Sequence, residues 1–196
     1  MTRAHYQGTR AWRYEADRKR QAKWRFETRT VTKVLAMLNG KIGSIIDAPV
    51  GTGRFLALYP PVPVLGLDLS QDMLDIAAAK DTGTELRRHD LLNDGMTEWA
   101  DLVVCVRFLN LVGWADAARA LGNLLGAAKR YAMFTMRTVP GSFKGAMRLG
   151  RVFLHRDGEL LRLLDAQGFE AVERYRFKDS VPGNYDLLLC QRVREQ

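Results

Sequence analysis

The stretch Ser44-Ile-Ile-Asp-Ala-Pro-Val-Gly-Thr-Gly-Arg-Phe55 decides the fold of this 196-residue chain. Its two isoleucines are typical of the end of a short buried strand, and Asp47 follows where that strand ends. Gly51 and Gly53 then let the backbone turn, and they let a ligand approach without meeting a Cβ atom. In open α/β folds, nucleotide-like ligands bind at such a turn, at the carboxyl edge of the parallel strands.

A second acidic residue ends the next predicted strand, Pro63-Val-Leu-Gly-Leu-Asp68. In Rossmann-like sites an acid at this place accepts hydrogen bonds from ribose hydroxyls. A carboxylate suits that role because it only accepts. In Leu69-Ser-Gln-Asp-Met-Leu74, which follows, Ser70 is the predicted N-cap of a helix, and Met73 lies on the apolar face of that helix.

Two further segments follow in order. Thr84-Glu-Leu-Arg-Arg-His-Asp-Leu91 alternates weakly and ends in an acid and a leucine. Residues 100–110, Ala-Asp-Leu-Val-Val-Cys-Val-Arg-Phe-Leu-Asn, are typical of a buried strand that continues into a loop.

The four segments together resemble the class I (Rossmann-like) S-adenosylmethionine-dependent methyltransferases over about residues 44–110. The spacing Asp-x-Pro-x-Gly-x-Gly resembles the first motif of that family, with Pro49 in place of its usual first glycine. It differs from the Gly-x-Gly-x-x-Gly spacing of dinucleotide-binding proteins. The run Asp-Leu-Ser-x-x-Met-Leu, starting at Asp68, resembles the second motif of the family.

The resemblance implies S-adenosyl-L-methionine as the cofactor and assigns contacts to it. Met73 would pack on adenine, although helical spacing equally explains it as a core residue. Asp90 would accept from the adenine amino group, and the N–H of Leu91 would meet the ring. From its position and charge alone, and not from the resemblance, Arg25 is expected over the methionine end of the cofactor, where it would pair with the carboxylate. The predicted cofactor-binding residues are Asp47, Pro49, Gly51, Gly53, Asp68, Leu69, Met73, Asp90, Leu91, Cys105, Arg107 and Arg25.

Residues 1–40 are predicted to form a basic, helical N-terminal cap, and residues 41–196 the methyltransferase domain. The prediction places one or two helices within residues 9–38, with Gly40 as the stop. The apolar stripe of the last helix is Val31, Val34, Leu35 and Leu38. The aromatic residues Tyr6, Trp12, Tyr14, Trp24 and Phe26 are interleaved with arginines. In the family such a cap covers the cofactor; an aromatic helix docked on the core is the alternative.

The whole pattern predicts an α/β fold with alternating strands and helices. Strands are expected at 42–47, near 63–68, at 84–89, 101–107, 131–136, 170–178 and 185–193, and helices at 53–59, 70–80, 114–128 and 157–169. Residues 138–156 are expected to form a loop that leads into a short basic helix. The resemblance implies a Rossmann-like, mostly parallel seven-stranded sheet with helices on both faces and an antiparallel C-terminal strand.

Composition agrees with a globular protein, with 47% hydrophobic and 27% charged residues. No apolar run approaches the roughly 20 residues of a membrane span, and Met1-Thr-Arg-Ala-His-Tyr6 has no apolar signal core, so a cytoplasmic protein is expected. Cys105 and Cys190 are predicted to be reduced core residues. Their number and spacing do not suggest a disulfide framework or a metal site.

The net charge of +8 is concentrated in residues 1–33 and in a second cluster of Lys144, Arg148, Arg151, His155 and Arg156. Such charge attracts phosphates, nucleic acid, anionic lipid headgroups or acidic small molecules. An ordinary solvated surface explains it equally well.

Three functions stay open at this point. The first is transfer of a methyl group to an O or N nucleophile of a small molecule, with anionic and phosphorylated acceptors included. The second is methylation of RNA or of a polyanion of the lipopolysaccharide type, and the third is non-catalytic binding of the cofactor. The glycine spacing and the C-terminal helix-strand-turn-strand pattern disfavour a nicotinamide oxidoreductase.

No catalytic residue is evident, because the sulfonium is reactive and the enzyme mainly aligns the reactants. His155 is the best-placed candidate for a general base, and a surface histidine is the alternative. Arg107 and Asn110 are candidates for orienting an acceptor.

Overall fold

The computed structural model describes residue 13 and residues 21–80, 82–145 and 147–193. Contacts divide the chain into two compact units, Met1–Asp94 and Gly95–Gln196, and each is described by itself. This division differs from the predicted cap and domain, which stays a prediction. Most of the expected N-terminal aromatic residues, Tyr6, Trp12 and Tyr14, lie outside the described residues.

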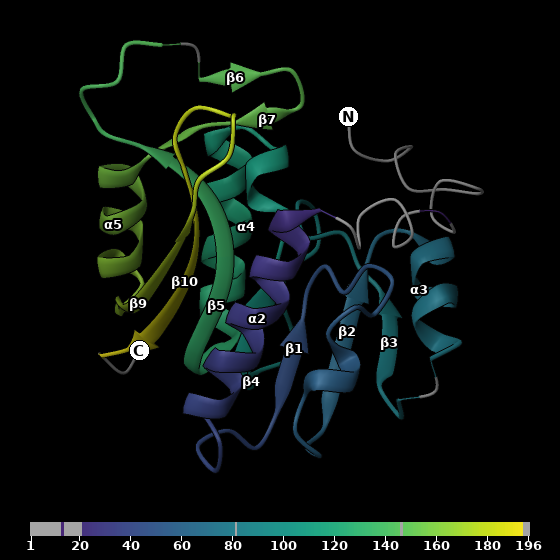
Figure 1. Cartoon of the computed structure of the whole chain (residues 1–196). Helices are drawn as coiled ribbons and strands as arrows, with labels where there is room; N and C mark the ends of the chain where they lie inside the picture. Colours follow the sequence, from purple (N-terminus) through teal and green to yellow (C-terminus); the bar gives the residue numbers. More distant parts are fainter. Residues whose placement is uncertain (1–12, 14–20, 81, 146, 194–196) are drawn as a thin grey trace. The chain divides into compact units, whose positions relative to one another are not determined.

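The first unit contains three parallel strands in the order β3-β2-β1 (Figure 1). Along the chain, its elements are α2 (Ala22–Met37), β1 (Ile45–Asp47), the 3-10 helix η1 (Leu56–Leu58), β2 (Val64–Asp68), α3 (Gln71–Ala78) and β3 (Glu85–Arg88). Asp47 pairs in register with Gly66, and Asp68 with Arg88. The carboxyl ends of the three strands therefore share one edge.

Local sequence explains the helix boundaries in this unit. The hydroxyl of Ser70 accepts from the backbone N–H of Met73 at 3.4 Å, as predicted for an N-cap. The apolar stripe of α2 is buried as predicted, and Gly40 has φ +70° soon after the helix ends. Gly66 has no room for a side chain, because an added Cβ would lie 2.6 Å from Leu86 Cδ2.

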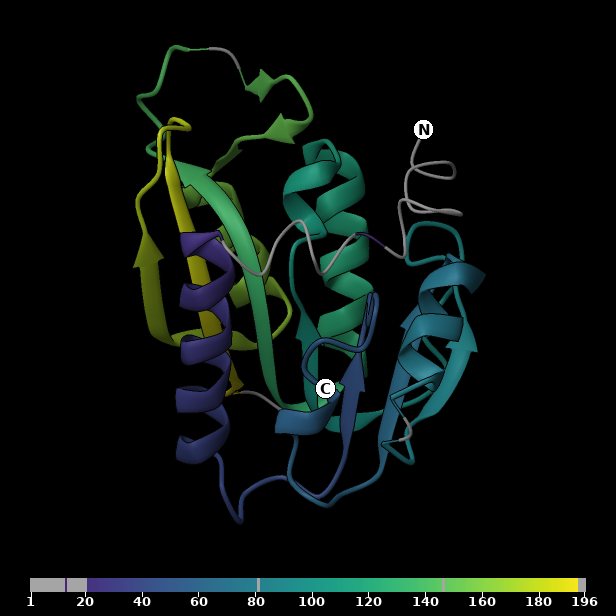
Figure 2. The ribbon, with the colours of Figure 1, turned by 45° about the vertical axis from the view of Figure 1, so that its right-hand side comes forward.

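The second unit contains strands in the order β4-β5-β10-β9. Along the chain, its elements are β4 (Ala100–Cys105), the 3-10 helix η2 (Leu109–Leu111), α4 (Trp114–Ala127), β5 (Ala128–Val139), β6 (Arg148–Leu149), β7 (Val152–Phe153), β8 (His155–Arg156), α5 (Asp157–Ala166), β9 (Phe169–Phe177) and β10 (Asn184–Arg192). β4 and β8 are parallel to β5, and β10 is antiparallel to both β5 and β9. Figures 1 and 2 show α4 and α5 on the same side of these strands.

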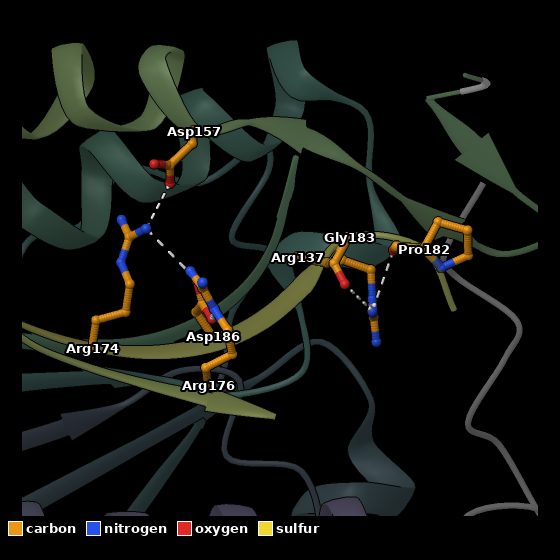
Figure 3. A network of polar contacts seen from close by, with 7 residues as sticks. All are labelled: Arg137, Asp157, Arg174, Arg176, Pro182, Gly183 and Asp186. Atoms are coloured by element: carbon orange, nitrogen blue, oxygen red, sulfur yellow. Dashed lines mark hydrogen bonds and ion pairs between the residues drawn. The ribbon is translucent and has the colours of Figure 1, made fainter. Parts of the chain in front are cut away.

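Charged side chains connect the antiparallel strands of this unit, and some of them are buried (Figure 3). Asp186 of β10 is fully buried and accepts from Arg176 Nε at 2.8 Å and Nη2 at 3.0 Å. Arg174 lies 3.7 Å from the same carboxylate and donates to Asp157 at 2.9 Å. Figure 3 also shows the buried Arg137 donating to the carbonyls of Pro182 and Gly183, in the turn between β9 and β10.

Two predicted elements are wrong. Residues 53–59 do not form an α-helix: turns lead into the single 3-10 turn η1, and Pro60 and Pro61 leave no room for a longer helix before β2. The short basic helix predicted in 138–156 is replaced by the antiparallel hairpin β6–β7, with Gly150 at φ +59° in its turn, and by β8. Strand β5 is longer than predicted because it pairs with β10 from Tyr131 to Thr138.

The fold class is confirmed: the chain has a Rossmann-like α/β architecture with mostly parallel strands and an antiparallel C-terminal strand. None of the helices in the described ranges has both the length and the hydropathy needed to cross a bilayer. In the same ranges no three His, Cys, Asp or Glu side chains are grouped as metal ligands would be.

Candidate functional site

The carboxylate of Asp68 holds the glycine turn against the end of β2. Its Oδ2 accepts from the N–H of Gly51 at 2.9 Å, and its Oδ1 accepts from the N–H of Ser70 at 2.9 Å. The N–H of Val50 also donates to the carbonyl of Leu67 at 2.7 Å. Burial raises the pKa of Asp68, and the backbone N–H groups of Ser70, Gly51 and Leu69 oppose that rise. Each carboxylate oxygen has a second lone pair that can accept from a ligand hydroxyl.

Asp47 lies at the end of β1 and is only 2% exposed. The hydroxyl of Tyr59 donates to its Oδ2 at 2.7 Å. Burial raises the pKa of Asp47 to about 7; the hydrogen bond from Tyr59 opposes the rise, and the charge of Asp68 adds to it. Asp47 and Asp68 are therefore electrostatically coupled carboxyl groups at one edge of the strands.

The two glycines of the turn have different surroundings. Gly51 has φ +56°, and a Cβ there would have no heavy atom within 4 Å. Gly53 has φ +70°, and a Cβ there would lie 2.8 Å from Leu56 Cδ1 and 3.0 Å from Ala77 Cβ. Gly53 is thus needed for packing the turn on α3, whereas Gly51 leaves the backbone open to close approach by a ligand. Pro49, between Asp47 and these glycines, follows a cis peptide bond.

The third acid, Asp90, follows β3, beside the end of β2: the N–H of His89 donates to the carbonyl of Asp68 at 2.9 Å. The carboxylate of Asp90 accepts from the N–H of Leu92 at 3.0 Å and from Asn93 Nδ2 at 2.7 Å. The structure thus brings the ends of all three predicted acidic strands to one edge, and local hydrogen bonds already orient the carboxylate of Asp90.

The apolar residues predicted to bind the cofactor differ in exposure. Met73 and Leu91 are buried, and Leu69 is half-buried. Met73 therefore fits the core explanation, and its contact with adenine stays a prediction.

Arg54, directly after the turn, was not predicted as a site residue. Its Nη1 donates to Glu27 at 2.6 Å, and its Nη2 donates to the Thr28 hydroxyl at 2.7 Å and to the Trp24 carbonyl. Its guanidinium carbon lies 3.5 Å from the centre of a Trp24 ring. Glu27 is fully buried, so a buried ion pair fastens α2 to the glycine turn. The sequence signal for this ion pair was Glu27, a charged residue beside the apolar face of a helix.

Arg25 lies on the exposed side of α2. Its predicted contact with the methionine carboxylate of the cofactor stays a prediction. Tyr59, the partner of Asp47, was also missed, because nothing in the sequence near the two prolines marks it as a site residue.

The other predicted residues belong to the second unit. Cys105 is buried at the end of β4. Arg107 has φ +65°, unusual for a residue other than glycine, and its N–H donates to the Thr135 hydroxyl at 2.7 Å. His155 is 1% exposed and lies in β8, so it is neither a surface residue nor part of a basic loop.

Known proteins match this chain in structure but not in sequence. No protein-family model matches the chain, and no curated protein matches it. Solved structures do match. The chain is similar to magnesium protoporphyrin IX methyltransferase from Synechocystis PCC 6803 with bound S-adenosylhomocysteine: the TM-score is 0.74 and the identity 18%, over 97% of each chain.

Two more solved structures share the fold. An amino pentose methyltransferase of Micromonospora echinaspora, with bound S-adenosylmethionine, has a TM-score of 0.66 and 19% identity, over 91% of this chain and 96% of that one. An O-methyltransferase of a polyketide synthase of Brevibacillus brevis, in complex with S-adenosylhomocysteine, has a TM-score of 0.70 and 12% identity, over 93% and 75%. The chain therefore has the fold of the class I S-adenosylmethionine-dependent methyltransferases.

Proposed function

We propose that this protein is a methyltransferase that uses S-adenosyl-L-methionine and acts on an O or N nucleophile of a small molecule. The observation that carries the proposal is the geometry around Asp68. The carboxylate holds the turn through the N–H groups of Gly51 and Ser70, and it keeps lone pairs for ribose hydroxyls. Similar folds crystallised with this cofactor or its product support the choice of ligand.

The binding experiment is calorimetric titration of the full chain with S-adenosylmethionine, S-adenosylhomocysteine and NAD. We expect the first two to bind and NAD to fail. The Asp68→Ala variant should bind the methyl donor more weakly by about 1–3 kcal/mol, because charge-assisted hydrogen bonds are lost. The control is Asp75→Ala, which removes an exposed carboxylate of α3 from the same unit.

Two results would contradict the cofactor assignment. One is an unchanged affinity in a folded Asp68→Ala variant. The other is tighter binding of NAD than of S-adenosylmethionine.

Catalysis is tested with a donor that carries a deuterated methyl group. The protein is incubated with this donor and a metabolite extract, and products are detected by their mass shift. A protein that binds the donor but labels no product would be the non-catalytic binding protein.

The basic residues 1–33 support a second candidate acceptor, a polyanion such as RNA. In the described part of that segment, Arg25, Arg29 and Lys33 recur every four residues along the exposed side of α2. Polyanion binding predicts an affinity for RNA that falls steeply with salt. If RNA binding is undetectable or does not depend on salt, the polyanion acceptor is rejected and the small-molecule acceptor is kept.

We also propose that residues 1–40 form a cap over the cofactor, since the buried Arg54–Glu27 pair anchors α2 to the turn. Deletion of residues 1–20 leaves α2 in place and should weaken binding of the methyl donor. Unchanged affinity would contradict the cap.

A further inference from the structure

Two acidic side chains of the first unit end neighbouring parallel strands. Asp47 is the last residue of β1 and Asp68 the last of β2, and Asp47 pairs in register with Gly66, two residues before Asp68. Asp47 is 2% exposed, Asp68 is half-buried, and the charge of Asp68 acts on Asp47. Two like charges in such surroundings resist simultaneous ionisation, so one of the carboxyl groups keeps its proton to a higher pH than it would alone.

The hydrogen bonds decide which of the two carboxyl groups keeps the proton. Asp68 accepts from two backbone N–H groups, those of Gly51 and Ser70, at 2.9 Å each. Such donors favour the ionised carboxylate. In the described part of the chain, the carboxyl group of Asp47 accepts from one neutral donor, the hydroxyl of Tyr59 at 2.7 Å. Asp47 is therefore the member of the pair that holds the proton, with a pKa of about 7.

The charged side chains of the surrounding elements are engaged with other groups. Besides Asp68, the described ones are Glu27 of α2, Arg54 of the turn, Asp72 and Asp75 of α3, Arg88 of β3, and His89 and Asp90 after β3. Arg54 pairs with Glu27, and Arg88 donates to the carbonyl of Leu69 at 3.2 Å. Neither arginine is among the groups that shift the pKa of Asp47, which are Tyr59 and Asp68 in addition to burial. A cation brought by a ligand would supply the counter-charge that these residues do not.

We propose that Asp47 gives up its proton when the cationic methyl donor binds, so that the affinity for the donor is controlled by pH around neutrality. This inference rests on the proposed methyltransferase function and adds a regulation of the same site. S-adenosylmethionine carries a sulfonium and an ammonium group against one carboxylate, and its net positive charge favours the ionised form of Asp47. The O–H bond of Asp47 breaks, the electron pair stays on the carboxylate, and the proton passes to the solvent.

Linkage gives the sign and the size of the effect. Below a pH of about 7 the free protein holds the proton, so binding must release it, and the affinity for the donor rises with pH. Between pH 6 and pH 7.5 we expect the dissociation constant of S-adenosylmethionine to fall by up to about tenfold. Above this window the affinity should level off, because the free protein has already lost the proton.

Calorimetric titration of the full chain, in two buffers of equal pH but different ionisation enthalpy, counts the protons released on binding. At pH 6 we expect about one proton for each S-adenosylmethionine bound. The matched probe is 5′-methylthioadenosine, which shares the adenosine and the sulfur but carries no charge, and it should release none. In the free protein, ¹³C resonances of the aspartate carboxyl groups should show Asp47 titrating at a pH of about 7. With saturating donor the same resonance should titrate at lower pH.

Two variants and one control separate the charge of Asp47 from its place in the structure. Asp47→Asn resembles the protonated form, so it should bind the donor like the wild type at pH 6 but up to about tenfold more weakly at pH 7.5, without releasing a proton. Tyr59→Phe removes the hydrogen bond that favours ionisation, and it should move the pH dependence of donor binding to higher pH. The control is Asp75→Asn, which changes an exposed carboxylate of α3 and should leave the proton count unchanged.

Three results would overturn the inference while leaving the proposed function in place: donor binding at pH 6 without proton release, equal release on binding 5′-methylthioadenosine, or unchanged release in Asp47→Asn. Absence of donor binding at both pH values would overturn the proposed function and this inference with it. If Asp47→Asn fails to fold, Tyr59→Phe and the wild-type proton count still decide the question.

Discussion

The hydroxyl of Tyr59 donates a 2.7 Å hydrogen bond to Oδ2 of Asp47, and this bond joins the end of η1 to the end of β1. The carboxyl group of Asp47 is buried beside that of Asp68, and burial raises its pKa from 3.8 to about 7. The folded protein therefore keeps a proton on Asp47 at pH values where the unfolded chain has lost it.

This pKa difference predicts how stability depends on pH. Between pH 3.8 and about 7 the folded state binds more protons than the unfolded state, so the free energy of unfolding falls as pH rises through this window. The fall reaches at most about 4 kcal/mol from this group and levels off above the folded pKa. In Asp47→Asn this contribution should disappear, while the amide oxygen still accepts from Tyr59. Urea unfolding at pH 5 and pH 8 measures it, with Asp116→Asn, whose side chain is 46% exposed, as the control. An equal pH dependence in wild type and Asp47→Asn would contradict the assignment.

The two turn glycines should respond differently to alanine. Gly51→Ala is expected to cost about 1 kcal/mol of stability, from the positive φ alone. In Gly53→Ala the new methyl group would also clash with Leu56 and Ala77. We expect this variant to lose about 1–3 kcal/mol more stability than Gly51→Ala, as for an overpacked core. Conversely, Gly51→Ala should weaken binding of S-adenosylmethionine while the protein stays folded. Thermal unfolding and calorimetry on the pair check both statements; equal stability losses would show that packing does not distinguish them.

Removing one partner of the Arg54–Glu27 pair should lower the free energy of unfolding more than removing both. Arg54→Met leaves the fully buried carboxylate of Glu27 uncompensated, and we expect a loss of about 3–5 kcal/mol. In the double variant Arg54→Met/Glu27→Gln much of this loss should be recovered, because no buried charge remains. The exposed pair Asp116–Arg119 is the control, and Arg119→Met should change stability by less than about 1 kcal/mol. Additive effects of the two Arg54–Glu27 substitutions would contradict the coupling.

Removing an arginine from the charge network of β10 should destabilise the protein more than removing the aspartate. Arg176→Met leaves Asp186, which is fully buried, with only the more distant Arg174, so we expect a loss of about 3 kcal/mol. Asp186→Leu should cost less than about 1 kcal/mol, because Arg176 can extend into water and Arg174 keeps its bond to Asp157. Urea unfolding of the two variants compares them directly. The opposite order would mean that the arginines, rather than the carboxylate, carry the cost of burial.

Sequence reasoning reached the parts of the fold that depend on local pattern. The glycine turn, the N-cap at Ser70 and the alternation of helix and strand are visible because neighbouring residues determine them. The mostly parallel sheet with an antiparallel C-terminal strand also followed from the resemblance to the methyltransferases.

Contacts between distant segments could not be read in the same way. The bond from Tyr59 to Asp47 and the fastening of Arg54 to α2 join residues far apart along the chain, and no spacing rule relates them. A helix was predicted where the hairpin β6–β7 forms, because the spacing of the basic residues there does not distinguish a helix from a strand. His155 was expected in a loop since its burial depends on pairing between β8 and β5.

The place of β10 has a consequence for how the second unit folds. This strand is synthesised after β9, yet it lies between β9 and β5 and forms the ladder with each. Until it emerges, β9 has no strand of its own unit to join, and β5 presents a bare row of amide and carbonyl groups. Such unpaired edges recruit strands of other chains. Slow synthesis or truncation ahead of residue 184 should therefore favour aggregation over a partly folded monomer.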